Sequence, residues 1–273
     1  MTDTLRITVI ALVINLIMAV AARRLRWLTL SGAVTAFFIG FVTYRFTRLG
    51  GFLILMLFFV TATVLGRVSR AMAGQSIQSG LQKKGGTRDW AQVLANGALA
   101  AGAALLYGFS SEVIALVMFG ASLAASTADT WSGEAGVLSS KPPISIRTGK
   151  AVPTGMSGGV SFLGTVSGMI GSVMIALSWY ATFADYRDTS YLFLASIIAV
   201  SGVIGSLADS FLGAVVQGHY YDPERNQITE HDRRDGKPLE LCRGIRWIDN
   251  DVVNVLSNVI AVVFASGLSL IFL

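Results

Sequence analysis

The sequence predicts an all-α, polytopic membrane helix bundle that forms a single integral membrane domain over residues 1–273. First, 53% of the residues are hydrophobic and 14% are charged, whereas a soluble domain usually carries about 25% charged residues. Second, the apolar stretches are about twenty residues long, enough for a helix to cross a hydrocarbon core of about 30 Å. Third, these stretches are continuous, which excludes the alternating pattern of a membrane barrel. Backbone groups in lipid need partners within their own segment, so we expect the spans to be helices.

Eight transmembrane helices are expected, at about residues 5–22, 28–44, 50–66, 90–108, 112–128, 158–180, 191–216 and 252–272. The first apolar run is followed by Arg23, Arg24 and Arg26, which is the wrong flank for signal-peptide cleavage. We therefore expect this helix to be retained. Cys242 is the only cysteine, which excludes an intrachain disulfide and a cysteine-based zinc site.

The basic residues predict the orientation of the spans, because Lys and Arg accumulate in cytoplasmic loops. If the N-terminus lies outside, the inner loops contain Arg23, Arg24, Arg26, Arg67, Arg70, Lys83, Lys84, Arg88, Lys141, Arg147, Lys150, Arg225, Arg233, Arg234, Lys237, Arg243 and Arg246. The outer segments keep Arg6, Arg45, Arg48 and Arg187. We therefore expect both termini outside and a site in the long inner loops, facing the cytoplasm. The net charge of +5 then indicates contact with an anionic leaflet rather than with nucleic acid.

Two similar segments each carry a carboxylate within, or at the end of, a predicted membrane span. Asp129 ends the fifth predicted span and is followed by Glu134, whereas Asp209 lies inside the seventh span. Ionisable groups in such positions are costly, and they indicate function. The likeness of Ser126–Thr130 to Ser206–Ser210 suggests an internal repeat, with a chance match as the alternative. Each Asp could instead cap a helix or pair with a basic residue.

A segment rich in proline and glycine, residues 142–161, leads into the sixth predicted span. Backbone N–H groups at the start of a helix form an anion site, and this segment supplies Thr154, Ser157, Gly158 and Gly159 there. Arg147 and Lys150 could add charge-assisted contacts to phosphate. The alternative is a flexible turn with an ordinary helix cap. Neither a Walker A loop nor a dinucleotide-binding fingerprint is present in the sequence.

Two further polar segments enter spans from the inner side. One contains Lys84, Arg88 and Asn96, and the other contains Asp249, Asn250, Asp251 and Asn254. Oxygen ligands of the second kind suit Mg²⁺, although a capped amphipathic helix start would look similar. Carboxylates and basic groups together are sufficient for phosphoryl transfer, which depends on positioning and charge neutralisation. His219 and His231 lie in a hydrophilic loop, where we expect both to be solvated.

Five blocks of sequence resemble those of the integral membrane family that includes the plant phytyl-phosphate kinases of vitamin E synthesis. They are Lys83-x-Gly-Gly-x-Arg88-Asp89-Trp90 with Asn96-Gly97, Ala128-Asp129-Thr130-Trp131-x-x-Glu134, Thr154-Gly155-x-Ser157-Gly158-Gly159, Ser206-Leu207-Ala208-Asp209-Ser210, and Asp249-Asn250-Asp251-x-Val253-Asn254. The likeness covers about residues 5–270 and extends distantly to CTP-dependent dolichol and phytol kinases. Family members commonly carry Ala-Ser-Glu where this chain has Ser132-Gly133-Glu134.

The resemblance implies a membrane kinase that moves a phosphoryl group from a nucleoside triphosphate, with CTP expected, to an isoprenoid monophosphate. Phytyl or geranylgeranyl phosphate would become the diphosphate, with Mg²⁺ as cofactor. We expect catalytic roles for Asp129, Glu134 and Asp209, and metal binding by these three together with Asp251 and Asn254. Substrate or nucleotide binding is expected from Lys84, Arg88, Asn96, Arg147, Lys150, Thr154, Ser157, Gly158, Gly159 and Asn250.

Transport is the alternative function, because carboxylates near the midplane and internal repeats also occur in secondary transporters. A transporter would place ionisable groups along a path to both faces. In this sequence the polar segments gather at the inner ends of the spans, which favours an enzyme. A lipid-packing or assembly protein would leave the clustered carboxylates unexplained.

Overall fold

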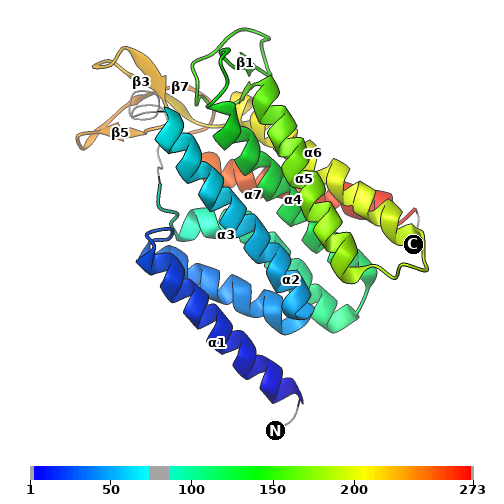
Figure 1. Ribbon diagram of the computed structural model, residues 1–273. Helices are drawn as coiled ribbons and strands as arrows, with labels where there is room; N and C mark the ends of the chain where they lie inside the picture. Colours follow the sequence, from blue (N-terminus) through cyan, green and yellow to red (C-terminus); the bar gives the residue numbers. More distant parts are fainter. Residues whose placement is uncertain (1–2, 74–85, 272–273) are drawn as a thin grey trace.

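The computed structural model describes residues 3–73 and 86–271, and helices dominate them (Figure 1). The described helices are α1 (Asp3–Arg24), α2 (Leu30–Ala73), α3 (Trp90–Ser110), α4 (Val113–Gly136), α5 (Phe162–Phe183), α6 (Ser190–Val215) and α7 (Asn250–Ser269). All seven are long and apolar enough to cross a membrane. The predicted all-α membrane bundle is therefore confirmed.

Helix α2 consists of two helices that meet at Arg48, where φ is 60° and ψ is −159°. A continuous helix of 44 residues would be roughly 66 Å long, about twice the hydrocarbon thickness. Figure 1 shows the chain reversing direction inside α2. Gly51 permits this bend, since a Cβ there would lie 2.0 Å from Thr47 Oγ1. The two halves correspond to the predicted spans at 28–44 and 50–66, so eight expected spans and seven described helices differ mainly at this bend.

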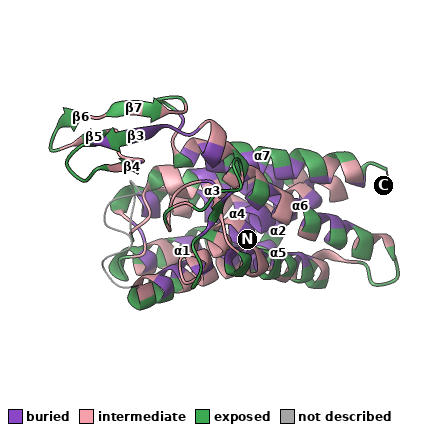
Figure 2. Cartoon of the chain, turned by 90° about the horizontal axis from the view of Figure 1, so that it is seen from above, coloured by how far each residue is buried: buried purple, intermediate pink, exposed green. Residues whose placement is uncertain are grey.

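Helix α4 forms the centre of the bundle. Of its most apolar stretch, 72% is buried inside the protein, against 17% for α1 at the edge. Figure 2 shows buried residues concentrated around α4 and exposed ones on the outer helix faces. Small side chains let its neighbours approach closely, which drives helix association in membranes. At Gly120, for example, a Cβ would come within 2.9 Å of the buried Trp179 ring.

Long connections gather at one end of the bundle, and short turns join helices at the other. Between α4 and α5, β1 (Ile144–Ser145) pairs with β2 (Gly159–Val160) in antiparallel fashion. Residues 216–249, here called the β-lobe, contain β3 (His219–Asp222), β4 (Gln227–Thr229), β5 (Arg233–Arg234), β6 (Lys237–Pro238) and β7 (Glu240–Arg243). Their order is β4-β3-β7 in one antiparallel sheet, with β5-β6 as a separate hairpin. Figure 1 shows these strands away from both chain ends.

The expectation that His219 is solvated was wrong, because its side chain is 1% exposed in the β-lobe. Its Nδ1 lies 2.8 Å from the carbonyl oxygen of Gln217, and its Nε2 lies 3.3 Å from Arg243 Nη2. Burial is the main cause that lowers the pKa of His219, and the charge of Arg243 adds to it. A neutral ring that donates from Nδ1 and accepts at Nε2 satisfies both contacts. His219 therefore anchors the start of the β-lobe beside Gln217.

Candidate functional site

A polar cavity of about 550 Å³ lies at the end of the bundle that carries the long connections. This volume falls within the range usual for small-molecule sites. Most of the predicted site residues line it: Arg88, Asn96, Asp129, Glu134, Thr154, Ser157, Gly158, Gly159, Asp209, Asn250, Asp251 and Asn254. Arg147 and Lys150 are exposed on the connection between α4 and α5 and do not line it. Lys84 lies outside the described residues.

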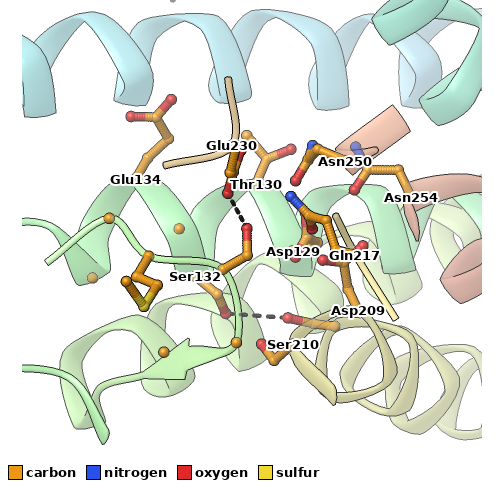
Figure 3. Close-up of a pocket in the computed structure, with 18 of the residues that line it drawn as sticks. Asp129, Thr130, Ser132, Glu134, Asp209, Ser210, Gln217, Glu230, Asn250 and Asn254 are labelled. Carbon is orange, nitrogen blue, oxygen red and sulfur yellow. Dashed lines mark hydrogen bonds between the residues drawn. The ribbon is translucent and has the colours of Figure 1, made fainter. Parts of the chain in front are cut away.

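A pair of carboxyl groups forms the acidic end of the cavity. Asp129 of α4 and Asp209 of α6 are within hydrogen-bonding reach of each other, and Figure 3 shows them facing one another. Ser257 of α7 donates to Asp209 Oδ2 at 3.0 Å. Two carboxyl groups in contact and away from bulk water need a shared proton or a cation between them. The acidic end is therefore a candidate cation site.

Close helix packing one turn away positions this carboxyl pair. A Cβ at Gly205 of α6 would lie 2.7 Å from the Cβ of Ala125 on α4 and 3.1 Å from that of Ala261 on α7. Residues four apart on a helix share a face. Asp209 follows Gly205 by four residues, and Asp129 follows Ala125 by four. The absent side chain at Gly205 thus brings the two acidic side chains together.

Two amide oxygens extend the acidic end. Oε1 of Gln217 and Oδ1 of Asn254 are buried, and neither has a hydrogen-bond partner among the described residues. Figure 3 shows both side chains beside Asp129 and Asp209. Buried polar atoms without partners are rare and call for an explanation. A hard cation such as Mg²⁺ accepts carboxylate and amide oxygens as ligands, so the donor set fits this ion.

The carboxylates do not form a complete cage for a metal. Within residues 3–73 and 86–271, no three His, Cys, Asp or Glu side chains converge at metal-binding distance. Mg²⁺ is typically held by one or two carboxylates, with substrate phosphates and water as the other ligands. The acidic end therefore suits a cation that arrives together with phosphate.

Glu134 belongs to a different end of the cavity, here called the basic end. It accepts a hydrogen bond from Ser69 Oγ at 2.5 Å and lies 3.5 Å from Arg70 Nη1, both at the end of α2. Gly66 makes room for it, since a Cβ there would lie 2.7 Å from Glu134 Oε1. Of the three carboxylates expected to act together, Asp129 and Asp209 lie together and Glu134 lies apart from them (Figure 3). Glu134 is paired with Arg70 instead.

Arg88 lines the basic end just before α3. Its backbone is fixed by hydrogen bonds with Trp27 and Thr29, of 3.1 and 3.0 Å. Burial lowers the pKa of Arg88, Glu134 raises it, and Arg70 lowers it again. An arginine keeps its charge at physiological pH despite such shifts. Two guanidinium groups near one carboxylate leave this end positive, which suits a phosphate group.

The glycine-rich segment lines another wall of the cavity, with residues 154–161. Gly158 has φ of 81°, and a Cβ there would lie 2.4 Å from that of Ala214 on α6, so only glycine fits. Helix α5 begins at Phe162 with Ser161 as its cap, later than the predicted start at 158. The N–H of Gly159 donates to the carbonyl oxygen of Met156 at 3.1 Å. In contrast to the prediction, it is therefore not directed toward a bound anion.

Glu230 enters the cavity from the β-lobe and accepts a hydrogen bond from Ser157 Oγ (Figure 3). The β-lobe thereby closes over the glycine-rich segment. Glu230, Gln217 and Arg70 also line the site or contact it, and the sequence did not predict them as site residues. Glu230 and Arg70 lie in stretches that contain other charged residues, and nothing local distinguishes them. Gln217 had one usable signal, since it directly follows the span that contains Asp209.

Comparison with known proteins identifies the family. The sequence profile described as "Integral membrane protein DUF92" matches residues 13–262. Protein PGR of Arabidopsis thaliana is 29% identical over 275 residues, which cover 91% of each chain. Protein VTE6, chloroplastic, of the same plant is 28% identical over 236 residues, which cover 84% of this chain and 62% of the relative.

An uncharacterised membrane protein of Methanocaldococcus jannaschii is 29% identical over 223 residues, which cover 79% of this chain and 85% of that protein. No solved structure matches the chain significantly. The chain therefore belongs to the DUF92 family of integral membrane proteins, and the resemblance drawn from its sequence blocks is confirmed.

Proposed function

We propose that this DUF92 family member is a Mg²⁺-dependent membrane kinase that transfers a phosphoryl group from CTP to an isoprenoid monophosphate. Phytyl or geranylgeranyl phosphate would be converted to the diphosphate. The observation that carries the proposal is a single cavity with a carboxyl pair at one end and two guanidinium groups at the other. Similarity to VTE6 over most of this chain supports it further.

The acidic end is suited to the nucleotide triphosphate. Asp129 and Asp209, with the amide oxygens of Gln217 and Asn254, would hold Mg²⁺ there. When bound, the ion neutralises charge on the phosphates of the donor. Asn250 and Asp251 line the same wall at the start of α7 and would orient the bound phosphates.

The basic end is suited to the acceptor phosphate. Arg88 and Arg70 would neutralise it, and Glu134 would hold the Arg70 guanidinium in place. An oxygen of the acceptor phosphate would attack the γ-phosphorus, and the bond from that phosphorus to the bridging oxygen of the donor would break. Because the acceptor is already an anion, no strong general base is needed. The products are the isoprenoid diphosphate and the nucleoside diphosphate.

The cytoplasm is the side where nucleoside triphosphates are found, and the distribution of basic residues supports a site that faces it. The cavity lies at the end with Arg23, Arg67, Arg88 and Arg246, as the positive-inside tendency requires. An even number of spans then leaves both termini on the outer side.

Transport remains the rival function, and the far half of the bundle argues against it. A transporter needs polar groups along a path to both faces. Beyond the cavity, the space between helices is instead filled by apolar side chains such as Phe119, Trp179, Leu194 and Ile198, each fully buried. Solute uptake by proteoliposomes that contain the purified protein would favour transport instead.

A substrate screen tests the proposed function. Purified protein in detergent would receive Mg²⁺ and labelled CTP, ATP, GTP or UTP, with phytyl or geranylgeranyl monophosphate as acceptor. We expect a labelled isoprenoid diphosphate with CTP, which the Asp129→Asn variant fails to form. Absence of product with every pair, from protein shown to be folded, would contradict the kinase proposal.

A further inference from the structure

A second hollow lies directly beside the polar cavity and differs from it in character. It is an apolar groove of about 60 Å³ between α1, α2 and α3. Its walls include Ala19, Ala22, Ala36, Leu55 and Phe59. Arg88, Gln92 and Asn96 line both the groove and the polar cavity, so the two hollows adjoin at these three side chains.

The groove exists because the side chains between α1 and its neighbours are small. Ala19 of α1 and Ala36 of α2 both line the groove, and both are only half-buried. The groove is therefore accessible from the lipid side of the bundle. Helix α1 is also the least buried of the described helices. A narrow apolar groove on the lipid-facing side of the bundle, next to a polar cavity, fits a molecule with an apolar tail and a polar head.

The junction between the two hollows contains basic and aromatic side chains. Trp27 lines the polar cavity, and its ring packs on Phe59 of the groove with centroids 5.8 Å apart. Arg67 lies over the Trp27 ring at 5.6 Å and donates to the carbonyl oxygen of Leu25 at 2.7 Å. Nε1 of Trp27 is buried and has no hydrogen-bond partner among the described residues. An unpaired N–H donor and the Arg88 side chain both line the cavity here, a combination that suits an anionic head group.

We propose that the isoprenoid tail of the acceptor lies in this apolar groove, with its phosphate at Arg88 and Trp27. The acceptor then reaches the polar cavity from the bilayer, while the nucleotide reaches it from water. The volume of about 60 Å³ accommodates the part of the tail next to the phosphate, and the remainder lies among lipid chains. This inference rests on the proposed function, because it assigns a binding site to the acceptor of that reaction.

Filling the groove tests the inference without requiring catalysis. The Ala19→Leu and Ala36→Leu variants place larger apolar side chains in the groove, and Ala98→Leu is the matched control on the lipid-exposed face of α3. Equilibrium binding of geranylgeranyl monophosphate and of dimethylallyl monophosphate would be measured in detergent without nucleotide. Thermal unfolding would confirm that each variant is folded.

We expect the two groove variants to bind geranylgeranyl monophosphate about tenfold more weakly, which corresponds to the loss of one or two buried methylene contacts. Binding of the short dimethylallyl compound should change much less, and Ala98→Leu should match the wild type for both. Groove-dependent binding without phosphoryl transfer would support the tail site while contradicting the kinase. Phosphoryl transfer with unchanged tail affinity in both groove variants would overturn the tail site alone.

A photoreactive tail gives an independent measurement. A geranylgeranyl monophosphate analogue with a diazirine on its first isoprene unit would be crosslinked to the wild-type protein and mapped by mass spectrometry. Crosslinks on α1, α2 and α3 around Ala19, Ala36 and Phe59 are expected. Crosslinks confined to α5 or α6, or equal displacement of the probe by phosphatidic acid, would overturn the assignment to an isoprenoid phosphate in this groove.

Discussion

The two ends of the polar cavity are built in different ways. The carboxyl pair and Asn254 of the acidic end come from α4, α6 and α7, and Gln217 lies just after α6. These helices pack so closely at Gly205 that a methyl group there would be 2.7 Å from Ala125. At the basic end, Arg88 belongs to a connecting segment, and Arg70 lies near the end of the described part of α2. Close helix packing gives the acidic end one geometry, which suits the proposed binding of a metal and a triphosphate. The basic end lies near the exposed helix α1, from which the proposed lipid acceptor would enter.

The largest expected effect comes from neutralising the carboxyl pair. Asp129→Asn and Asp209→Asn should each lower kcat by on the order of 10³-fold or more, because charge stabilisation by the metal is lost. Ser257→Ala removes the hydrogen bond to Asp209 and keeps both carboxylates, so a much smaller loss is expected. Steady-state kinetics and thermal unfolding of the purified variants provide the measurement. A near-normal kcat in these two variants would contradict a role of the acidic end in catalysis.

The basic end should affect the acceptor and leave the nucleotide unaffected. We expect Arg88→Gln to raise the KM for the isoprenoid monophosphate by roughly 10- to 100-fold, as the loss of a charge-assisted contact does. The KM for CTP should change little. Arg147→Gln is the matched control, since Arg147 is exposed at the same end of the bundle and outside the cavity. Equal effects of the two variants would mean that the basic end is not a specific phosphate site.

Adding a methyl group at Gly205 should disturb the acidic end through helix packing. Gly205→Ala would be overpacked against Ala125 and Ala261, which typically costs about 1–3 kcal/mol. Gly102→Ala on α3 is the control, because nothing lies within 4 Å of its added Cβ. A lower unfolding temperature and lower kcat are expected for Gly205→Ala alone. If both variants behave like the wild type, close packing at Gly205 does not determine the positions of Asp129 and Asp209.

The smallest effect is expected at the contact between the β-lobe and the glycine-rich segment. Glu230→Gln keeps the shape of the side chain but weakens the hydrogen bond from Ser157, so a change in kcat/KM of only a few-fold is expected. Glu224→Gln, at an exposed position of the same lobe, is the matched control. A loss as large as that of Asp129→Asn would instead make Glu230 part of the acidic end.

Hydropathy predicted most of the fold because each span is a nearly uninterrupted apolar run. It located the helix ends less well. Helix α4 continues to Gly136, eight residues beyond the predicted end, because helical hydrogen bonding persists where the side chains become polar. The sheet of the β-lobe was missed, since its strands of four residues or fewer carry no clear alternation in hydrophobicity.

The sequence predicted those residues of the candidate site whose polarity differs from that of their neighbours in the sequence. Asp129 and Asp209 stand out as charges in apolar runs, and both line the cavity. Glu230 and Arg70 lie among other charged residues in the sequence, so they can be identified as site residues only from the three-dimensional structure. The pairing of Glu134 with Arg70 joins α4 to α2 across 64 positions of sequence and has no local signal. The catalytic and binding roles of all these residues remain predictions.

Binding of each substrate separately to two variants tests the two-ended cavity most directly. Affinities for CTP with Mg²⁺ and for geranylgeranyl monophosphate would be measured on Asp129→Asn and Arg88→Gln. We expect Asp129→Asn to lose affinity for the nucleotide and keep it for the lipid phosphate, and Arg88→Gln to do the reverse. Loss of the same substrate in both folded variants would contradict a cavity with two separate binding ends.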